Sequence, residues 1–197
     1  MAGTVLFRDT QVNCGRCYDS MMKSDPALSL PSEAQRLRVA ILLGRDPRGL
    51  RAIPVFDEEG EPLVIRVASI VDGKPFPTLY WLVGSDICLR IDRLEAAGAI
   101  AELQRRVDAS EALRGAMLAD HARHRKERAS FLSSEERQVL EERGMQAALD
   151  ERGIGGIAEP DRIRCLHTWY AAHLVTPNVV GTLVNELLAD GEYLAAD

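Results

Sequence analysis

The sequence contains little of what marks several specialised classes of protein. Only four of its 197 residues are cysteine, too few for the disulfide scaffold of a small secreted domain. Aromatic residues make up 5% of the chain, too sparse for a surface that stacks nucleic-acid bases. The longest aliphatic run, at 39–43, is far shorter than a membrane span. The first residues lack a basic segment followed by an apolar stretch, so we expect no secretory signal. We therefore expect a cytoplasmic protein without membrane segments.

Signatures of large enzyme classes are also missing. No G-x-G-x-x-G follows an expected strand, and the chain has neither a Walker A loop nor a G-x-S-x-G elbow. Acidic residues outnumber basic ones, 30 Asp and Glu against 24 Lys and Arg, so the net charge is 24 − 30 = −6. This balance argues against a general nucleic-acid coat. RNA contact through the basic helix face at 121–128 is kept only as a minor alternative.

The residues that are present indicate one folded domain with an appendage. Hydrophobic residues form 46% of the chain, enough to build a core without metal or disulfide bonds. Residues 1–31 have a mixed composition without a sustained period and are interpreted as an arm. The range 32–197 is interpreted as a single domain.

Hydrophobic periodicity predicts the elements of that domain. Two β-rich runs within 51–70 surround a polar turn, as in a hairpin, and 79–83 is a third strand candidate. Pro54 would place the first of these strands at an edge or a bulge. Most of the rest has helical spacing, including a helix that Asp161 would cap. The prediction is an α+β fold, in which five or six helices pack on a small antiparallel sheet of about three strands.

A basic segment at 36–51 is the first candidate site. Five arginines stand there against one acid, which leaves 5 − 1 = +4 in an acidic chain. Guanidinium groups match phosphate or carboxylate oxygens, and a Gly-rich turn could aim Arg45 and Arg48 in one direction. A second candidate is the Pro-rich loop after the hairpin, which would hold Lys74 and Thr78 in fixed positions. The structural alternatives are surface ion pairs and a loop that only steers the chain.

Two histidines, His121 and His124, share a helical face at i and i+3. This spacing allows both imidazoles to bind one metal ion, although no carboxylate of an H-E-x-x-H type lies nearby. A polar pocket wall or a hydrogen-bonded structural pair are the alternatives. A second weak metal candidate is Cys14-x-x-Cys17, which lacks the second pair of a zinc ribbon. Zinc at either place is a hypothesis, as is no special role.

Near the carboxyl terminus, Cys165, His167 and His173 suggest a thiol–imidazole or metal site. On a regular helix, Cys165 and His167 would lie about 200° apart, on nearly opposite faces. We therefore do not expect them to chelate one ion together. His167 and His173 flank the buried stripe of the expected helix and could each line a pocket. The alternative is that both are hydrogen-bonded residues of a structural helix.

Four ordered segments resemble an uncharacterised bacterial family, domain of unknown function 501. They are LGRDPRG at 43–49, DGKPFPTLY at 72–80, RLEAAG at 93–98 and PDRIRCLH at 160–167. His173 and the Pro-Asn pair at 177–178 extend the last one. The resemblance covers roughly 36–190 and leaves the Cys14/Cys17 arm without a counterpart. It implies a bacterial cytoplasmic protein and no established activity.

The hypothesis that unites these residues is a pocket for an anionic, phosphorylated small molecule. Lys74 and the two turn arginines would neutralise the anion, with Thr78 and Arg164 as further ligand contacts. Histidines 121, 167 and 173 would supply hydrogen bonds, or acid–base chemistry if a reaction occurs. Whether the protein is an enzyme stays open. The alternative is a non-catalytic interaction protein that docks a protein partner through its helical half.

Overall fold

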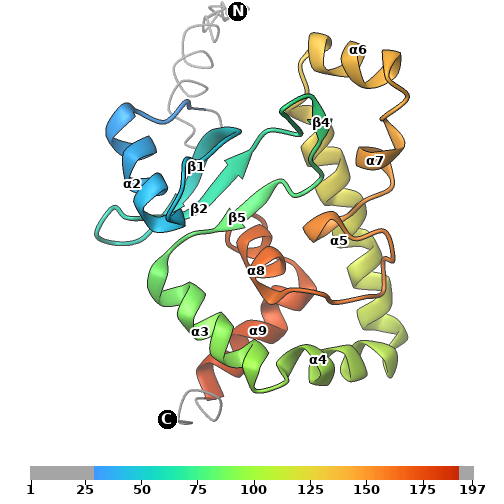
Figure 1. Ribbon diagram of the computed structural model, residues 1–197. Helices are drawn as coiled ribbons and strands as arrows, with labels where there is room; N and C mark the ends of the chain where they lie inside the picture. The colour runs from blue at the N-terminus through green and yellow to red at the C-terminus, as the bar shows by residue number, and fades with distance from the viewer. Residues whose placement is uncertain (1–28, 191–197) are drawn as a thin grey trace, which may run out of the picture.

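The computed structural model describes residues 29–190 (Figure 1). This range begins with helix α2 (Glu33–Leu43) and continues with strands β1 (Leu50–Phe56), β2 (Pro62–Val67), β3 (Ile70–Val71), β4 (Lys74–Pro75) and β5 (Tyr80–Leu82). The helices α3 (Ser85–Ala96), α4 (Ala99–Asp108), α5 (Glu111–Ser130), α6 (Ser134–Glu142) and α7 (Ala147–Asp150) follow. A 3₁₀ turn, η1 (Ile154–Gly156), then precedes α8 (Leu166–Val175) and α9 (Val179–Asp190).

The predicted α+β fold is confirmed. Strands β1, β2 and β5 form an antiparallel sheet in the order β1-β2-β5, and β3 pairs with β4 in a small separate hairpin. β1 is thus an edge strand, and its register shifts between Ala52 and Val55, where Pro54 lies. Eight α-helices occur in residues 29–190, more than the five or six expected. One of them, α7, is a single turn, too short to leave a periodic signal in the sequence.

The sheet has an apolar core on each face because its central strand is buried on both sides. In β2, Val64 belongs to the core that the sheet shares with α8 and the other carboxyl-terminal helices. Its neighbour Ile65 belongs to a second core, together with Val39 of α2. Side chains alternate between the faces of a strand, so one strand supplies both layers. Figure 1 shows α2 and the α8–α9 pair on opposite sides of the sheet.

Local capping signals set several helix ends. Ser32 and Ser133 each form a capping box, in which the serine hydroxyl accepts from a backbone N–H and the side chain three residues on binds back. Ser110 caps α5 through the N–H of Leu113. Gly44 ends α2 in the left-handed conformation, with φ of 65°.

The expected helix start at Asp161 is wrong, because α8 begins only at Leu166. The segment before it is held by distant side chains: the Ile163 N–H donates to Gln104 Oε1, and the Leu166 N–H donates to a Glu95 carboxylate oxygen. A carboxylate 71 residues away therefore caps this helix. The residues around Asp161 therefore do not predict where this helix begins.

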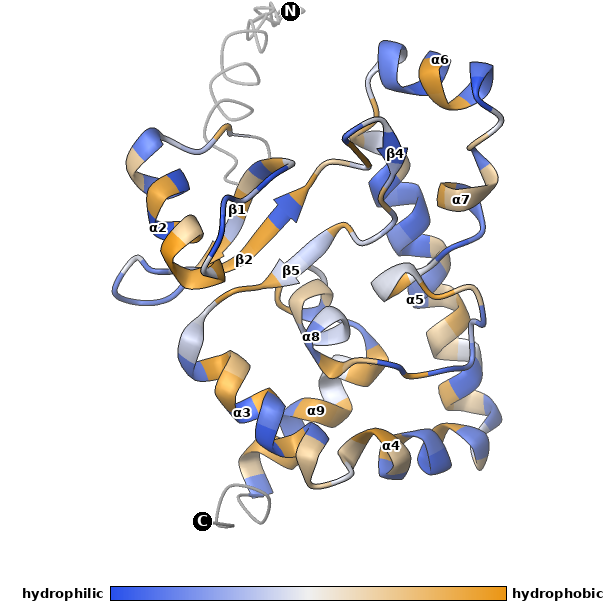
Figure 2. Ribbon diagram, in the orientation of Figure 1, coloured by the Kyte–Doolittle hydropathy of each residue, from blue (hydrophilic) through white to orange (hydrophobic). Residues whose placement is uncertain are grey.

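The elements also differ in hydropathy, as Figure 2 shows. β2 and α9 are largely apolar, whereas α5 and α6 carry many hydrophilic residues. Within residues 29–190, no helix combines the length and the apolar character needed to cross a bilayer.

Candidate functional site

The sequence-predicted ligand residues lie at separate places on the surface. Arg48 forms an ion pair with Asp72, 3.0 Å between Nη1 and Oδ2, and both side chains are 66% exposed. Lys74 is exposed in β4, in the same hairpin as Asp72. Arg45 lies over the ring of Trp81, with its guanidinium carbon 5.0 Å from the ring centre.

The other two predicted contacts, Thr78 and Arg164, are also apart. Arg164 pairs with Glu159 at 2.8 Å in the exposed segment before α8. Thr78 is half-buried in the loop that leads into β5. The role of these residues in ligand binding stays a prediction, as do the roles of the metal candidates Cys14 and Cys17, which lie outside the described residues.

The histidines predicted on α5 are interior residues. The Nδ1 atom of His121 accepts a hydrogen bond from the Ile154 N–H at 2.9 Å, and its ring lies 4.8 Å from that of Trp169. His124 is 5% exposed, and its Nε2 atom has no hydrogen-bond partner among residues 29–190. Burial, with help from Arg125, lowers the pKa of His121 to about 4. Burial and the adjacent Arg128 lower the pKa of His124 to about 3, so both rings are neutral at pH 7.

His173 joins α8 to α9. Its Nδ1 atom lies 3.1 Å from the Asn178 N–H, and its Nε2 atom lies 3.1 Å from the Asn185 side-chain amide. The ring stacks on Tyr170 at a centroid distance of 5.8 Å. Both ring nitrogens are thus engaged in contacts that hold the two helices together.

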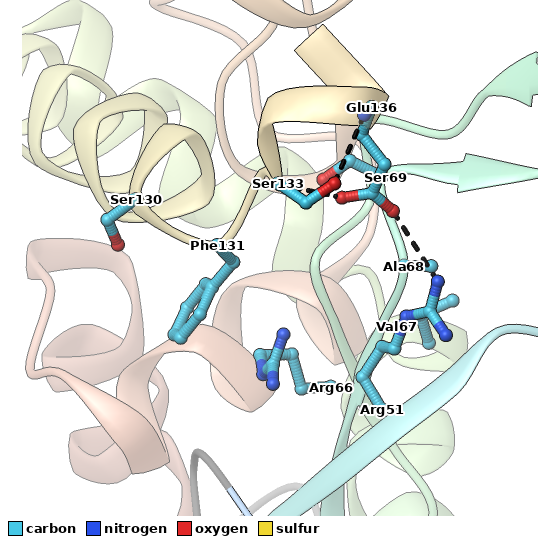
Figure 3. Close-up of a pocket in the computed structure, with 9 residues that line it drawn as sticks. All are labelled: Arg51, Arg66, Val67, Ala68, Ser69, Ser130, Phe131, Ser133 and Glu136. Carbon is cyan, nitrogen blue, oxygen red and sulfur yellow. Dashed lines mark hydrogen bonds and ion pairs between the residues drawn. The ribbon is translucent and has the colours of Figure 1, made fainter.

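An open pocket lies between the sheet and the α5–α6 corner, with a volume of about 590 Å³. This volume falls within the usual range of small-molecule sites. Figure 3 shows its walls: arginines come from β1 and β2, and Phe131 and two serines come from the end of α5 and the start of α6. The nine lining residues are Arg51, Arg66, Val67, Ala68, Ser69, Ser130, Phe131, Ser133 and Glu136.

Arg66 is the most deeply placed charge of this pocket, with 8% of its surface exposed. Its guanidinium lies over the Phe131 ring, 4.0 Å from the ring centre, within the range of a cation–π contact. Arg51 pairs with Glu136 over 3.4 Å. The lining residues carry two guanidinium groups and one carboxylate, a formal charge of 2 − 1 = +1. Burial lowers the pKa of Arg66, but an arginine guanidinium is not deprotonated in proteins, so the group stays charged.

The sequence predicts a binding role for the segment that contains one of these two arginines and none for the other. Arg51 belongs to the basic segment at 36–51, whereas Arg66 is expected only as part of a β-rich run. The signal was present, since Arg66 interrupts the apolar run of β2, PLVIRV. A charged residue in a strand that is buried on both faces needs a partner or a ligand.

A second cluster joins α3 to the start of α8. The Nδ1 atom of His167 lies 3.4 Å from Glu95 Oε1 and 3.8 Å from the sulfur of Cys165. On the other side of the ring, Nε2 lies 3.3 Å from Asp92 Oδ1. Glu95, Cys165 and His167 each offer one ligand atom, and these atoms lie within 4.8 Å of one another. The cluster is partly buried and is the one such group of three among residues 29–190.

The expectation that Cys165 and His167 face opposite ways is therefore wrong. It assumed a regular helix through both residues, but Cys165 is the N-cap of α8 and has an extended backbone, with φ of −153°. Its side chain thus lies close to the His167 ring. The hydrogen bond with Cys165 raises the pKa of His167 to about 9, with Glu95 and Asp92 adding to the effect and burial opposing it.

The protein is thus an α+β domain with two candidate sites. One is the basic pocket, and the other is the cluster of sulfur, nitrogen and oxygen atoms between α3 and α8. The model of one family, described as Protein of unknown function (DUF501), matches residues 53–186. The match covers more than half of the chain, so the protein belongs to this family. Three of the four segments that indicated the resemblance lie inside the match, and the one at 43–49 lies before it. No curated protein and no solved structure matches the chain. Arg66 and all residues of the second cluster lie inside the matched range, whereas Arg51 lies just before it.

Proposed function

We propose that the protein binds an anionic, phosphorylated small molecule in the pocket between the sheet and the α5–α6 corner. The observation that carries this proposal is the Arg66 guanidinium, held against Phe131 at the wall of a cavity of about 590 Å³. A planar donor group recognises phosphate oxygens in pairs. The pocket therefore replaces the Arg45, Arg48 and Lys74 set as the proposed place of binding.

The second arginine can be released to a ligand at little cost. The Arg51–Glu136 pair is long, at 3.4 Å, and about half of the Arg51 side chain is exposed. Ion pairs of this kind contribute about 0–1 kcal/mol. A phosphate group that enters the pocket would thus meet two guanidinium groups, and the release of Arg51 breaks only a long, partly exposed ion pair. The hydroxyl groups of Ser69, Ser130 and Ser133 line the same cavity and add polar contacts.

Acid–base chemistry is not part of this proposal. His167 belongs to the cluster between α3 and α8, and His121 and His173 pack against other elements. None of the three lines the basic pocket. A protein partner that docks on the helical half, and a bacterial cytoplasmic setting, stay predictions from the sequence.

Calorimetric titration with inorganic phosphate, pyrophosphate and a hexose phosphate tests the binding. We expect at least one of these probes to bind, and Arg51→Gln and Arg66→Gln each to weaken it about tenfold or more, because each loses a charge-assisted hydrogen bond. Circular dichroism checks the fold of the Arg66→Gln protein, and the exposed Arg51 gives the cleaner variant.

Matched controls use Arg48→Gln and Lys74→Gln, which remove equal charge outside the cavity. Unchanged affinity in these controls, with loss in the pocket variants, supports the proposal. Loss in the controls alone would instead favour the set predicted from the sequence. Binding of none of the three probes would contradict the proposal.

A further inference from the structure

Three electron-pair donors converge where α3 meets the start of α8. They are a carboxylate oxygen of Glu95, the sulfur of Cys165 and Nδ1 of His167. Such groups repel one another unless a positive charge lies between them. A bound metal ion or a shared proton can provide it, and the distances between the donors distinguish the two.

The two separations that involve His167 are close to those around a tetrahedral ion. With Zn–N and Zn–O bonds of about 2.0–2.1 Å and a Zn–S bond of about 2.3 Å, tetrahedral angles place N and O about 3.3 Å apart and N and S about 3.6 Å apart. His167 Nδ1 lies 3.4 Å from Glu95 Oε1 and 3.8 Å from the Cys165 sulfur. The Nδ1–Oε1 separation exceeds the 2.7–2.9 Å that a direct charged N–H···O hydrogen bond prefers.

The surrounding residues orient these donors as outer partners do in metal sites. The Asp92 carboxylate, 3.3 Å from Nε2, is placed to accept a hydrogen bond from the N–H of that nitrogen. Nδ1 is then the atom that would bind an ion once it has lost its proton. The Leu166 N–H donates to Glu95 Oε1 and fixes the carboxylate beside the imidazole. Cys165 faces the same point because the helix starts one residue later.

We propose that Glu95, Cys165 and His167 bind a divalent transition-metal ion, with zinc as the metal that this donor set fits best. One sulfur, one nitrogen and one oxygen ligand suit zinc better than magnesium or calcium, which prefer oxygen alone. Three protein ligands leave a fourth position for water or a substrate atom, as in catalytic zinc sites. The site shares no residue with the basic pocket, so this proposal stands independently of the proposed function.

The test measures metal binding to the full chain in a Cys14→Ser/Cys17→Ser background, which removes the other thiol pair able to bind zinc. Metal-free protein is titrated with Zn²⁺ against a chromophoric chelator, and with Co²⁺ to detect thiolate-to-metal absorption. We expect one equivalent of zinc and a cobalt–thiolate band. Cys165→Ser and His167→Gln should weaken zinc binding more than about 100-fold, and Asp92→Asn about 10–100-fold.

Cys88→Ser is the matched control, since Cys88 is a half-buried thiol on α3 outside the cluster, and zinc binding should not change. Circular dichroism checks that each variant folds. If Cys165→Ser does not fold, the exposed Asp92 provides a variant without packing contacts in the core. Less than about one-fifth of an equivalent of zinc, or equal binding in all variants, would overturn the proposal and leave a proton shared within the cluster.

Discussion

Four of the five side chains that α5 buries are polar or charged: Asp120, His121, His124 and Arg128, with Met117 as the exception. Three of them form hydrogen bonds to the backbone of other segments. Asp120 Oδ2 accepts from the Val179 N–H at 2.8 Å and so caps the start of α9. His121 accepts from the Ile154 N–H. At the scale of the residue, these side chains hold loops and helix ends onto α5.

The neutral histidines make stability depend on pH. Both pKa values are depressed in the folded state, to about 4 for His121 and about 3 for His124, against 6.5 as the ordinary value. The unfolded chain thus binds more protons between these values. Stability is complete above about pH 6.5 and falls as the pH decreases. At pH 5 we expect each histidine to lower the free energy of unfolding by about 1–2 kcal/mol relative to pH 7.5.

Urea unfolding at pH 7.5 and 5.0 measures this effect. Because carboxylates also respond to acid, the informative quantity is the loss of stability between the two pH values, compared between the wild type and His124→Gln. The variant should lose about 1–2 kcal/mol less. An identical loss in both proteins would show that His124 does not titrate in the expected way.

At the scale of the element, local sequence predicted what depends on local interactions. The hairpin and the third strand follow from β-rich runs and the polar turn between two of them. The start of α8 could not be predicted, since its cap is the distant Glu95. That one error also hid the cluster, because a helix through Cys165 would separate it from His167.

Contact between α8 and α9 depends on a glycine. A Cβ atom at Gly181 would lie 2.1 Å from His173 Cγ and 2.2 Å from its Cβ, distances that no real contact reaches. Gly181→Ala therefore has to move His173 or the helix, and we expect it to lower the free energy of unfolding by about 1–3 kcal/mol. Chemical unfolding measures the change.

Gly115→Ala is the matched control within a helix. Nothing lies within 4 Å of a Cβ atom at Gly115 of α5, so the added methyl group only reduces the freedom of the unfolded chain. This variant should gain about 0.5–1 kcal/mol. If both variants were stabilised, the close approach of α8 and α9 would not be required for folding.

At the scale of the whole molecule, the candidate sites form only where distant segments meet. The pocket joins Arg51 and Arg66 of the sheet to Phe131 at the end of α5, and the sequence pattern placed one arginine in a basic segment without showing what it would face. Spacing identifies which residues share a helix face. It does not identify which elements pack together, so the sequence supplied the chemistry of the pocket but not its assembly.

The buried side chain of Arg128 connects α5 to two other parts of the chain. Arg128 of α5 is 1% exposed and donates to the carbonyl oxygens of Pro77, Leu149 and Arg152, the first at 2.7 Å. These carbonyls belong to the loop before β5 and to the segment around α7. Burial lowers the pKa of Arg128 to about 10, so it remains charged at pH 7 and its hydrogen bonds are charge-assisted.

Replacing Arg128 with methionine keeps much of the volume and removes every donor. Three carbonyl groups would then lose a buried partner, at about 1–3 kcal/mol each where water cannot replace it. We expect Arg128→Met to lower the free energy of unfolding by about 3 kcal/mol or more, and Lys126→Met, an exposed cation of the same helix, by less than about 0.5 kcal/mol. Hydrogen exchange should show the loss first at 147–156, because two of the three carbonyl groups that bind Arg128 belong to that segment. Equal effects of the two substitutions in urea unfolding would mean that the apolar cores, not Arg128, hold the α7 segment against the sheet.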